Sequence, residues 1–464
     1  MTDKQHLGIV IVGHVDAGKS TTTGRLLFEL GGIKPREMEK LKKSAADIGK
    51  DSFAFAFFMD KNKDERERGI TIQCTTKEFF TDTKHYTIID APGHRDFIKN
   101  MISGASQADV ALLMVPANKG GFEIAIAKED RKQGVIQGQT RQHARLCKLL
   151  GVEQLIVGIN KMDDSSVNYD EKRYNEIKSE MELMLKKIGY KIKKIPFIPM
   201  SGFHGENLTK VSEKMPWYKG WEVNINKKEK KKGHTLVDAL DTIVKAPVRK
   251  VEEHVRMPMS AVLKIQGVGD VVCGRIEQGI IKPGMDVGFT PSGAKGRIFS
   301  IEMHHRNVEE AGPGDNVGIN VKGFSKDGTN RPISGDIMYV VSQGELKQVE
   351  SFKAIIAVQE HPGQLKCGKD GRGGFTPSVH VRTAKAPCRM DKIHWKLHSK
   401  RTGGKKVDDP IYIQQGDSAE ITMKPNTPLY CEAFDSCPGL GRLACMDSNS
   451  LVMLGKVTEV KYKE

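Results

Sequence analysis

The residues best suited to chemistry lie near the start of the chain. An apolar run, 7–12, leads into a loop with glycines at both ends, and a helix-like run, 21–30, leaves it. This order of strand, loop and helix is typical of a phosphate-binding P-loop, in which backbone N–H groups and the helix N-terminus face an anion. Lys19 is expected to reach the outer phosphates and Ser20 to hold Mg²⁺. The predicted phosphate-binding residues are Gly13, His14, Val15, Asp16, Ala17, Gly18, Lys19, Ser20 and Thr21.

A second motif, Asp90-Ala91-Pro92-Gly93, follows the strand-like run 86–89. A carboxylate at the C-terminal end of a strand lies where open α/β sheets bind ligands, and Asp90 can hold Mg²⁺ through water. The Gly93 amide can meet the terminal phosphate. By itself the motif is an ordinary turn, but its place one strand after the P-loop favours a nucleotide site.

Two single residues are candidates for the reaction itself. Thr71, in the segment Arg68-Gly69-Ile70-Thr71, can give Mg²⁺ a second hydroxyl, so loss of the terminal phosphate would release the loop before it. His94 directly follows Gly93 and is predicted to orient an attacking water, although a lone histidine is more often structural. Val15 and Ile70 could form an apolar gate over that water, or could simply pack.

The third motif, Asn160-Lys161-Met162-Asp163, ends the strand-like run 155–159. An acidic side chain here can accept hydrogen bonds from the N1–H and 2-amino groups of guanine, and adenine has neither donor. The predicted guanine-binding residues are Asn160, Lys161 and Asp163, with Ser201, Gly202 and Phe203 completing the pocket. The expected ligands are therefore GTP or GDP with Mg²⁺.

Short apolar runs alternate with amphipathic segments up to about residue 200, which predicts a doubly wound, mainly parallel α/β sheet. A charged stretch, 227–233, is interpreted as a loop, and 236–243 as a last short helix. Strand-sized runs separated by turns follow, which favours two all-β barrels. We predict three domains: 1–245, 246–344 and 345–464.

Composition limits the class of protein. The 464 residues include 73 Lys and Arg against 58 Asp and Glu, a net charge of +15 that suits a polyanionic partner such as nucleic acid. The eight cysteines form no C-x-x-C pair, which argues against a zinc site and for a reducing compartment. The sequence has neither a signal-peptide pattern nor an apolar run of membrane-spanning length, so a cytoplasmic protein with no membrane partner is expected.

Taken together, four segments resemble the elongation factor 1-alpha family of translational GTPases, and the likeness covers nearly the whole chain. They are Gly-His-Val-Asp-Ala-Gly-Lys-Ser-Thr, Glu-Arg-Glu-Arg-Gly-Ile-Thr-Ile, Asp-Ala-Pro-Gly-His-Arg-Asp-Phe and Asn-Lys-Met-Asp. The resemblance implies a GTP-binding domain followed by two β-barrels, ribosome-stimulated GTP hydrolysis and delivery of aminoacyl-tRNA to the ribosomal A site by a monomer. It also implies an exchange factor, and an aminoacyl-end contact through Glu302, His304 and Asn316.

Two positions depart from the usual pattern of that family. Asp270 stands where threonine is usual, and no arginine follows Asp447 at Ser448. Both resemble the elongation factor-like branch. Two other functions remain open: a release-factor or ribosome-rescue GTPase, whose switch departs from Gly-Ile-Thr-Ile, and a non-catalytic RNA-binding or cytoskeletal scaffold, suggested by the positive charge.

Overall fold

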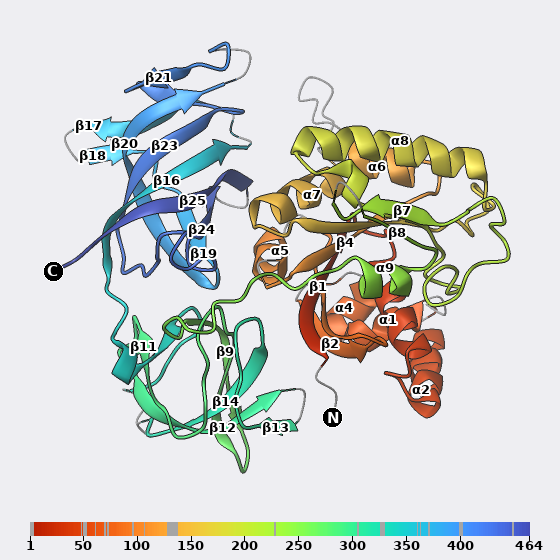
Figure 1. Ribbon diagram of the computed structural model, residues 1–464, viewed down its shortest axis with the longest axis horizontal. Helices are drawn as coiled ribbons and strands as arrows, with labels where there is room; N and C mark the ends of the chain where they lie inside the picture. The colour runs from red at the N-terminus through yellow and green to blue at the C-terminus, as the bar shows by residue number, and fades with distance from the viewer. Residues whose placement is uncertain are drawn as a thin grey trace. The chain divides into compact units, whose positions relative to one another are not determined.

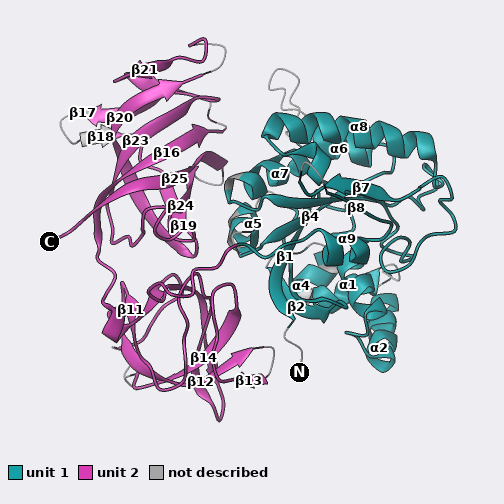
Figure 2. Cartoon of the chain, viewed as in Figure 1, with its two compact units in different colours: residues 1–247 teal, residues 248–464 magenta. Residues whose placement is uncertain are grey.

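The protein is seen here in a computed structural model, and the description below is limited to part of the chain. The described residues are 4–47, 49, 53–60, 62–68, 71, 74–94, 97–105, 107–127, 138–226, 229–303, 306–324, 330–359, 361, 363–369, 372–398, 402–447 and 450–464. The chain divides into two compact units, residues 1–247 and 248–464 (Figure 2).

The first unit is built on a six-stranded sheet in the order β2-β3-β1-β4-β5-β6 (Figure 1). All neighbours are parallel except β2 and β3. β4 is buried along its whole length, because helices pack on both faces of such a sheet. The predicted doubly wound, mainly parallel sheet is confirmed. Its strands are β1 (Gln5–Gly13), β2 (Thr75–Phe80), β3 (Lys84–Asp90), β4 (Val110–Pro116), β5 (Gln154–Asn160) and β6 (Phe197–Pro199).

Helix α8 begins and ends where local chemistry predicts. The side chain of Asp170 accepts hydrogen bonds from the amides of Lys172 and Arg173 at the start of α8, and Gly189 ends it with a φ of 101°. The helices are α1 (Lys19–Glu29), α2 (Pro35–Ala46), α3 (Ala56–Met59), α4 (Lys63–Arg68), α5 (Ile98–Ala105), α6 (Gly121–Ile126), α7 (Gln139–Leu149), α8 (Glu171–Ile188), the 3₁₀ turn η3 (Ile192–Lys194) and α9 (Leu236–Thr242).

The prediction of a charged loop at 227–233 is wrong over its last four residues. Lys230–Gly233 is a strand, β8, paired antiparallel with β7 (Trp221–Asn224). Glu222 on β7 accepts from Lys230 at 2.6 Å and pairs with Lys232 at 2.9 Å. These cross-strand ion pairs offset the charge repulsion among the lysines, and a sequence pattern without apolar alternation gives no sign of them.

The second unit contains two closed antiparallel barrels, as predicted. One sheet runs β11-β15-β9-β10-β14-β12-β13 and closes through β11 and β12, and the other runs β19-β24-β25-β16-β23-β20-β21 and closes through β19 and β20. Their strands are β9 (Met257–Ile265), β10 (Gly269–Arg275), β11 (Asp286–Thr290), β12 (Lys295–Met303), β13 (Arg306–Val308), β14 (Asn316–Lys322), β15 (Ile337–Val340), β16 (Val349–Val358), β19 (Ser378–Val381), β20 (Ala384–Leu397), β21 (Lys406–Asp408), β23 (Ser418–Pro425), β24 (Arg442–Asp447) and β25 (Ser450–Tyr462).

Three short segments complete this unit: β17 (Leu365–Lys369), β18 (Arg372–Gly374) and β22 (Tyr412–Ile413) form a separate small sheet, and a 3₁₀ turn, η4 (Val341–Gln343), follows the first barrel. Each barrel has its own apolar core. Two ion pairs join the barrels, Arg256 with Glu432 and Arg382 with Glu277, each at 2.7 Å. The domain boundaries at 245 and 344 stay predictions. Among the helices described, none is both long enough and apolar enough to cross a membrane.

Candidate nucleotide-binding site

The three sequence motifs meet at one edge of the first unit's sheet. Gly13 ends β1, Asp90 ends β3 and Asn160 ends β5, and these strands run parallel with β4 between the first and the last. Gly18 has a φ of 82°, and a Cβ there would lie 2.4 Å from the side-chain nitrogen of Asn160. Only glycine therefore lets the P-loop and the third motif approach this closely.

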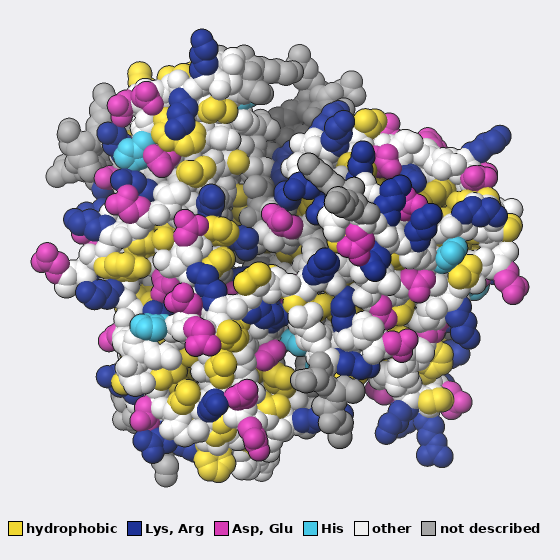
Figure 3. Space-filling view, in the orientation of Figure 1, with side chains coloured by type: hydrophobic (Ala, Val, Ile, Leu, Met, Phe, Trp, Pro, Cys, Tyr) yellow, Lys and Arg dark blue, Asp and Glu magenta, His cyan; other side chains and the backbone are white. Residues whose placement is uncertain are grey.

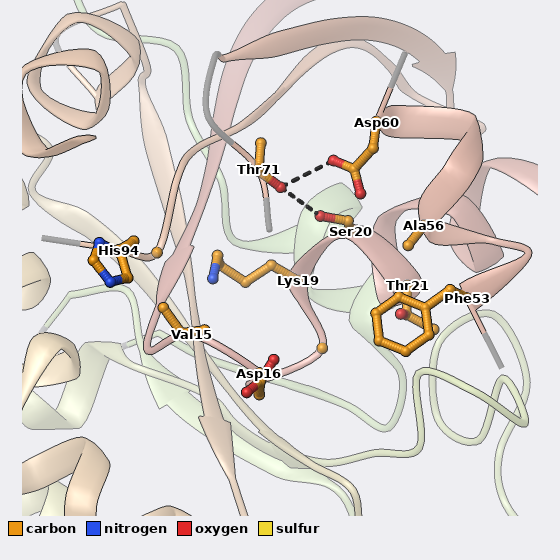
Figure 4. Close-up of a pocket in the computed structure, with 12 residues that line it drawn as sticks. Val15, Asp16, Lys19, Ser20, Thr21, Phe53, Ala56, Asp60, Thr71 and His94 are labelled. Carbon is orange, nitrogen blue, oxygen red and sulfur yellow. Dashed lines mark hydrogen bonds between the residues drawn. The ribbon is translucent and has the colours of Figure 1, made fainter. Parts of the chain in front are cut away.

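Two cavities form a continuous depression along this edge. A narrow one of about 70 Å³ reaches Lys19, Thr71 and His94, and a wide one of about 790 Å³ reaches Asp163 and Phe203 (Figure 4 shows the narrow one). The two share the lining residues Val15, Asp16, Gly18, Thr21 and Phe53. The shape suits an extended ligand with a compact head and a broader base.

Ser20 and Thr71 are brought into contact, although they lie far apart in the sequence. Their hydroxyl oxygens are 3.1 Å apart, and the Thr71 hydroxyl donates to Asp60 at 3.0 Å (Figure 4). Burial, with the nearby Asp90 charge, raises the pKa of Asp60 to about 7. Asp60 was missed in the sequence because a carboxylate eleven residues before Thr71 belongs to no short motif.

Asp90 and Lys19 are buried charged groups, and burial shifts the pKa of each. Asp90 is fully buried, and neither of its carboxylate oxygens has a hydrogen-bond partner among the described residues. Burial raises its pKa to about 6, although the Ser20 hydroxyl and the Lys19 charge oppose the shift. The Lys19 ammonium donates to the His14 carbonyl at 2.9 Å, and burial lowers its pKa.

This oxygen donor set fits Mg²⁺, which prefers carboxylate and hydroxyl ligands and keeps several waters. The orphaned carboxylate of Asp90 is the observation that tests the fit, since a buried charge without a partner is costly. Gly93 lies against the P-loop: a Cβ there would come within 2.4 Å of the Lys19 ammonium and 3.1 Å of the Val15 nitrogen. The Gly93 backbone would therefore lie close to a ligand bound by the Lys19 ammonium.

His94 lines the narrow cavity with Val15; in Figure 4 it lies to the left of the Lys19 side chain, and Thr71 lies above that side chain. Its ring is tilted against that of Phe97, with centroids 5.9 Å apart. The predicted gate partner Ile70 lies outside the described residues. The predicted catalytic role of His94 and the gate stay predictions.

At the end of the site where the base is predicted to bind, the Asn160 side chain connects two loops. Its side-chain nitrogen donates to the Ala17 carbonyl at 2.8 Å, and its side-chain oxygen accepts from the Gly202 amide at 2.7 Å. One amide therefore ties the P-loop to the loop after β6. Lys161 and Asp163 line the wide cavity with Phe203, whereas Ser201 is fully buried behind it. Asp163 lies 3.9 Å from the half-exposed His204.

Helix α7 supports the P-loop from behind through two residues that the sequence did not reveal. The Val15 amide donates to the Gln139 side chain and the Gly13 amide donates to Nδ1 of His143, both at 3.2 Å. Burial lowers the pKa of His143 to about 3, so the ring stays neutral and can accept. Its position in an amphipathic helix gives no sequence signal of this contact.

The residues predicted to hold an aminoacyl end lie in the second unit. Glu302 on β12 faces Gly318 of β14, and Asn316 begins β14 opposite Arg275. His304 lies outside the described residues. Asp270, one of the two departures, forms an ion pair with Arg331, and the other, Ser448, is not described. The tRNA roles are untested by this geometry.

The α/β domain with its P-loop and guanine-type motif, followed by two β-barrels, defines the class of translational GTPases. Family models agree: the elongation factor Tu GTP-binding domain matches residues 4–246, elongation factor Tu domain 2 matches 269–339, and the eEF1A C-terminal domain matches 351–458.

Curated relatives narrow the assignment. Elongation factor 1-alpha of Eremothecium gossypii is 46% identical over 99% of this chain and 95% of the relative. That of Tetrahymena pyriformis is 44% identical over 100% and 99%. The chain belongs to the elongation factor 1-alpha family, and it is a translation elongation GTPase that uses GTP with Mg²⁺.

Solved structures agree in fold. The S. cerevisiae Ski7 GTPase-like domain, bound to GDP and inorganic phosphate, superposes with a TM-score of 0.75 at 18% identity, over 98% of this chain and 97% of that one. Translation elongation factor SelB of Methanococcus maripaludis, in complex with the GTP analogue GppNHp, gives 0.66 at 19%, over 100% and 81%.

Proposed function

We propose that this chain binds aminoacyl-tRNA as a GTP complex, delivers it to the ribosomal A site in the cytoplasm and hydrolyses GTP after codon recognition. The carrying observation is the contact between Ser20 and Thr71 beside the buried Asp90 carboxylate, whose oxygens have no hydrogen-bond partner among the described residues. It supports a site where the loop that ends at Thr71 is held by Mg²⁺ and the terminal phosphate. A non-catalytic scaffold would not need these groups to converge.

In this proposal the residues divide the work along the nucleotide. Lys19 leaves the His14 carbonyl for the phosphates, while Ser20, Thr71 and Asp90 hold Mg²⁺, which neutralises phosphate charge when bound. Asp163 accepts from guanine, with Lys161 along the base and the backbone of 201–203 closing the pocket. His94 orients the attacking water once the ribosome is bound.

The first barrel is proposed to grip the aminoacyl end through Glu302, His304 and Asn316. Adjacent strands carry Glu302 and Asn316, which is compatible with one shared contact surface. Within the family, we infer the elongation factor-like branch from Asp270 and Ser448, whose usual counterparts are threonine and arginine.

The deciding experiment measures complex formation with charged and uncharged tRNA in GTP and in GDP. We expect a stable complex only with charged tRNA and GTP, and a steep loss of affinity with salt, because phosphate contacts release counterions. The variant Asn316→Ala should weaken it while GTP binding stays normal. The matched control is Asn426→Ala, an exposed asparagine of the other barrel. Equal affinity for uncharged tRNA would refute the proposal.

Two further expectations, on the oligomeric state and on an exchange factor, follow from the same proposal. The free protein is expected to sediment as a monomer, and GDP release is expected to be slow enough to need an exchange factor. Measuring the rate of GDP release with and without a cytoplasmic extract tests the second expectation. A spontaneous rate as fast as the stimulated one would remove the need for such a partner.

A further inference from the structure

A third cavity lies at the opposite edge of the first unit's sheet. It has a volume of about 290 Å³ and is lined by Val110 at the start of β4 and by residues 154–156 at the start of β5. β5 ends at Asn160, so the cavity and the guanine loop lie at opposite ends of one strand, about 20 Å apart at about 3.3 Å per residue. It takes no part in the nucleotide site.

The inner wall of this cavity is apolar and well ordered by packing. Leu155, Ile195 and Val244 are each at most 6% exposed. Tyr190 is also buried, and its hydroxyl already donates to the backbone, 3.2 Å from the Ala144 carbonyl and 3.3 Å from that of Val152. The Lys148 ammonium lies over the Tyr190 ring, 5.2 Å from its centroid. A volume of about ten waters, at about 30 Å³ each, suits a short alkyl chain.

The rim is positively charged and largely unpaired. Four lysines line the cavity, Lys148, Lys191, Lys194 and Lys245, against one acidic residue, Glu153. Glu153 pairs with Lys148 at 3.9 Å. The other three lysines are exposed, and their ammonium groups make no ion pair or hydrogen bond with any residue that the structure describes.

Helix dipoles do not account for this excess charge. Lys148 lies in the last turn of α7, and Lys186 and Lys187 lie in the last turn of α8, where cations offset the partial negative charge of a helix C-terminus. Lys191 and Lys245 lie outside the helices, and Lys194 ends the three-residue 3₁₀ turn η3, which is too short to carry a large dipole. Three positive charges beside an apolar recess favour a ligand with two negative charges and a short tail.

We propose that this cavity binds a phosphate monoester of a short apolar chain, with its phosphate held by Lys191, Lys194 and Lys245 and its chain between Leu155, Ile195 and Val244. Ammonium groups bind phosphate as point charges, and the apolar wall removes the chain from water. The same chemistry can come from a free metabolite or from the phosphate headgroup of a lipid, and the experiment separates these sources.

The test is titration calorimetry of the full chain with hexyl phosphate, with inorganic phosphate and hexanol as the two half-ligands. We expect saturable one-to-one binding of hexyl phosphate, at least about tenfold tighter than either half-ligand, because only the ester uses both the rim and the wall. Equal binding of inorganic phosphate, or no binding of hexyl phosphate, would overturn the proposal.

Two variants locate the site. The double variant Lys191→Gln/Lys194→Gln should weaken hexyl phosphate about tenfold, whereas Lys187→Gln/Lys193→Gln removes the same charge from the same segment outside the cavity and should change it less than about twofold. The larger side chain of Ile225→Trp, at the half-buried edge of the cavity, should block the chain. Equal losses in both double variants would mean a general field effect and refute the site. GTP binding by each variant reports that it is folded.

Vesicles of phosphatidylcholine with and without phosphatidic acid then distinguish the sources. Co-sedimentation that requires phosphatidic acid, competes with hexyl phosphate and is lost in Ile225→Trp identifies a lipid. Tight binding of hexyl phosphate without co-sedimentation identifies a free ester. Vesicle binding that Ile225→Trp leaves intact would show that the apolar wall is unused, which contradicts the proposal.

Discussion

The two halves of the nucleotide site differ in how far the protein completes them by itself. At the base half, both polar atoms of the Asn160 amide are bonded, to the Ala17 carbonyl at 2.8 Å and to the Gly202 amide at 2.7 Å. At the phosphate half, both oxygens of the buried Asp90 lack a described partner, and Lys19 rests on a backbone carbonyl.

This difference shows where nucleotide and Mg²⁺ contribute. The base half is a frame in which the Asn160 amide is bonded to protein groups on both sides. The phosphate half is an incomplete charge cluster, in which burial raises the pKa of Asp60 and Asp90 and lowers that of Lys19. We expect a cation and phosphates to complete that cluster, and the switch segment before Thr71 to depend on them. On the face shown in Figure 3, Lys and Arg are interspersed with Asp and Glu.

The largest effect is expected from a change in the phosphate half of the site, on the rate of GTP hydrolysis. His94→Ala should leave GTP and aminoacyl-tRNA binding nearly normal but reduce ribosome-stimulated hydrolysis about a thousandfold, about 4 kcal/mol, because water positioning is lost. Single-turnover hydrolysis with programmed ribosomes measures it, with His234→Ala as a control outside the cavities. A variant with the full stimulated rate would mean that His94 is only a packed side chain.

A change in the base half of the site should instead alter which nucleotide the protein prefers. Asp163→Asn replaces an acceptor by a donor toward guanine N1, so GTP affinity should fall about a hundredfold and xanthosine triphosphate should gain. Asp82→Asn is the matched control, because Asp82 is exposed and lines neither of the two cavities. Fluorescence titration with both nucleotides decides. Unchanged GTP affinity would disprove the guanine contact.

A smaller effect is expected on the affinity for GTP relative to the affinity for GDP. Asp60→Ala removes the acceptor of the Thr71 hydroxyl, so the loop should be held less well and the affinity for GTP should fall about tenfold, with little change for GDP. Asp64→Ala, at an exposed position of α4, is the control. If both nucleotides weakened equally, Asp60 would support the fold in general and not the switch.

The smallest effect concerns the frame behind the P-loop. Because burial lowers the pKa of His143 to about 3 from the usual 6.5, the unfolded chain takes up a proton that the folded chain refuses as the pH falls below about 6.5. The free energy of unfolding should therefore fall more steeply in the wild type than in His143→Gln, by up to about 1.4 kcal/mol per pH unit. Urea denaturation between pH 6 and 4.5 measures the slopes, which should be alike between pH 7 and 8. Equal slopes below pH 6 would argue against a neutral, buried ring.

The sequence by itself was enough for the α/β class of the first unit, the two barrels and the strand ends that carry each motif. Local patterns suffice here, because a P-loop, a strand-end carboxylate and a guanine motif each have short, fixed spacing, and parallel strands bring their C-terminal ends to one edge. The family followed from the same motifs and is confirmed by the relatives.

Tertiary structure alone decided the contacts between segments distant in sequence. The Asp60 hydrogen bond to Thr71 and the support of the P-loop by Gln139 and His143 join residues that share no motif. The strand at Lys230–Gly233 pairs with β7, where Glu222 forms ion pairs with Lys230 and Lys232. The lysine-rimmed cavity forms only where segments from β4 to the end of α9 come together in the fold. Each of these contacts depends on which side chains come together in the folded chain, and the spacing of residues along the sequence does not determine that.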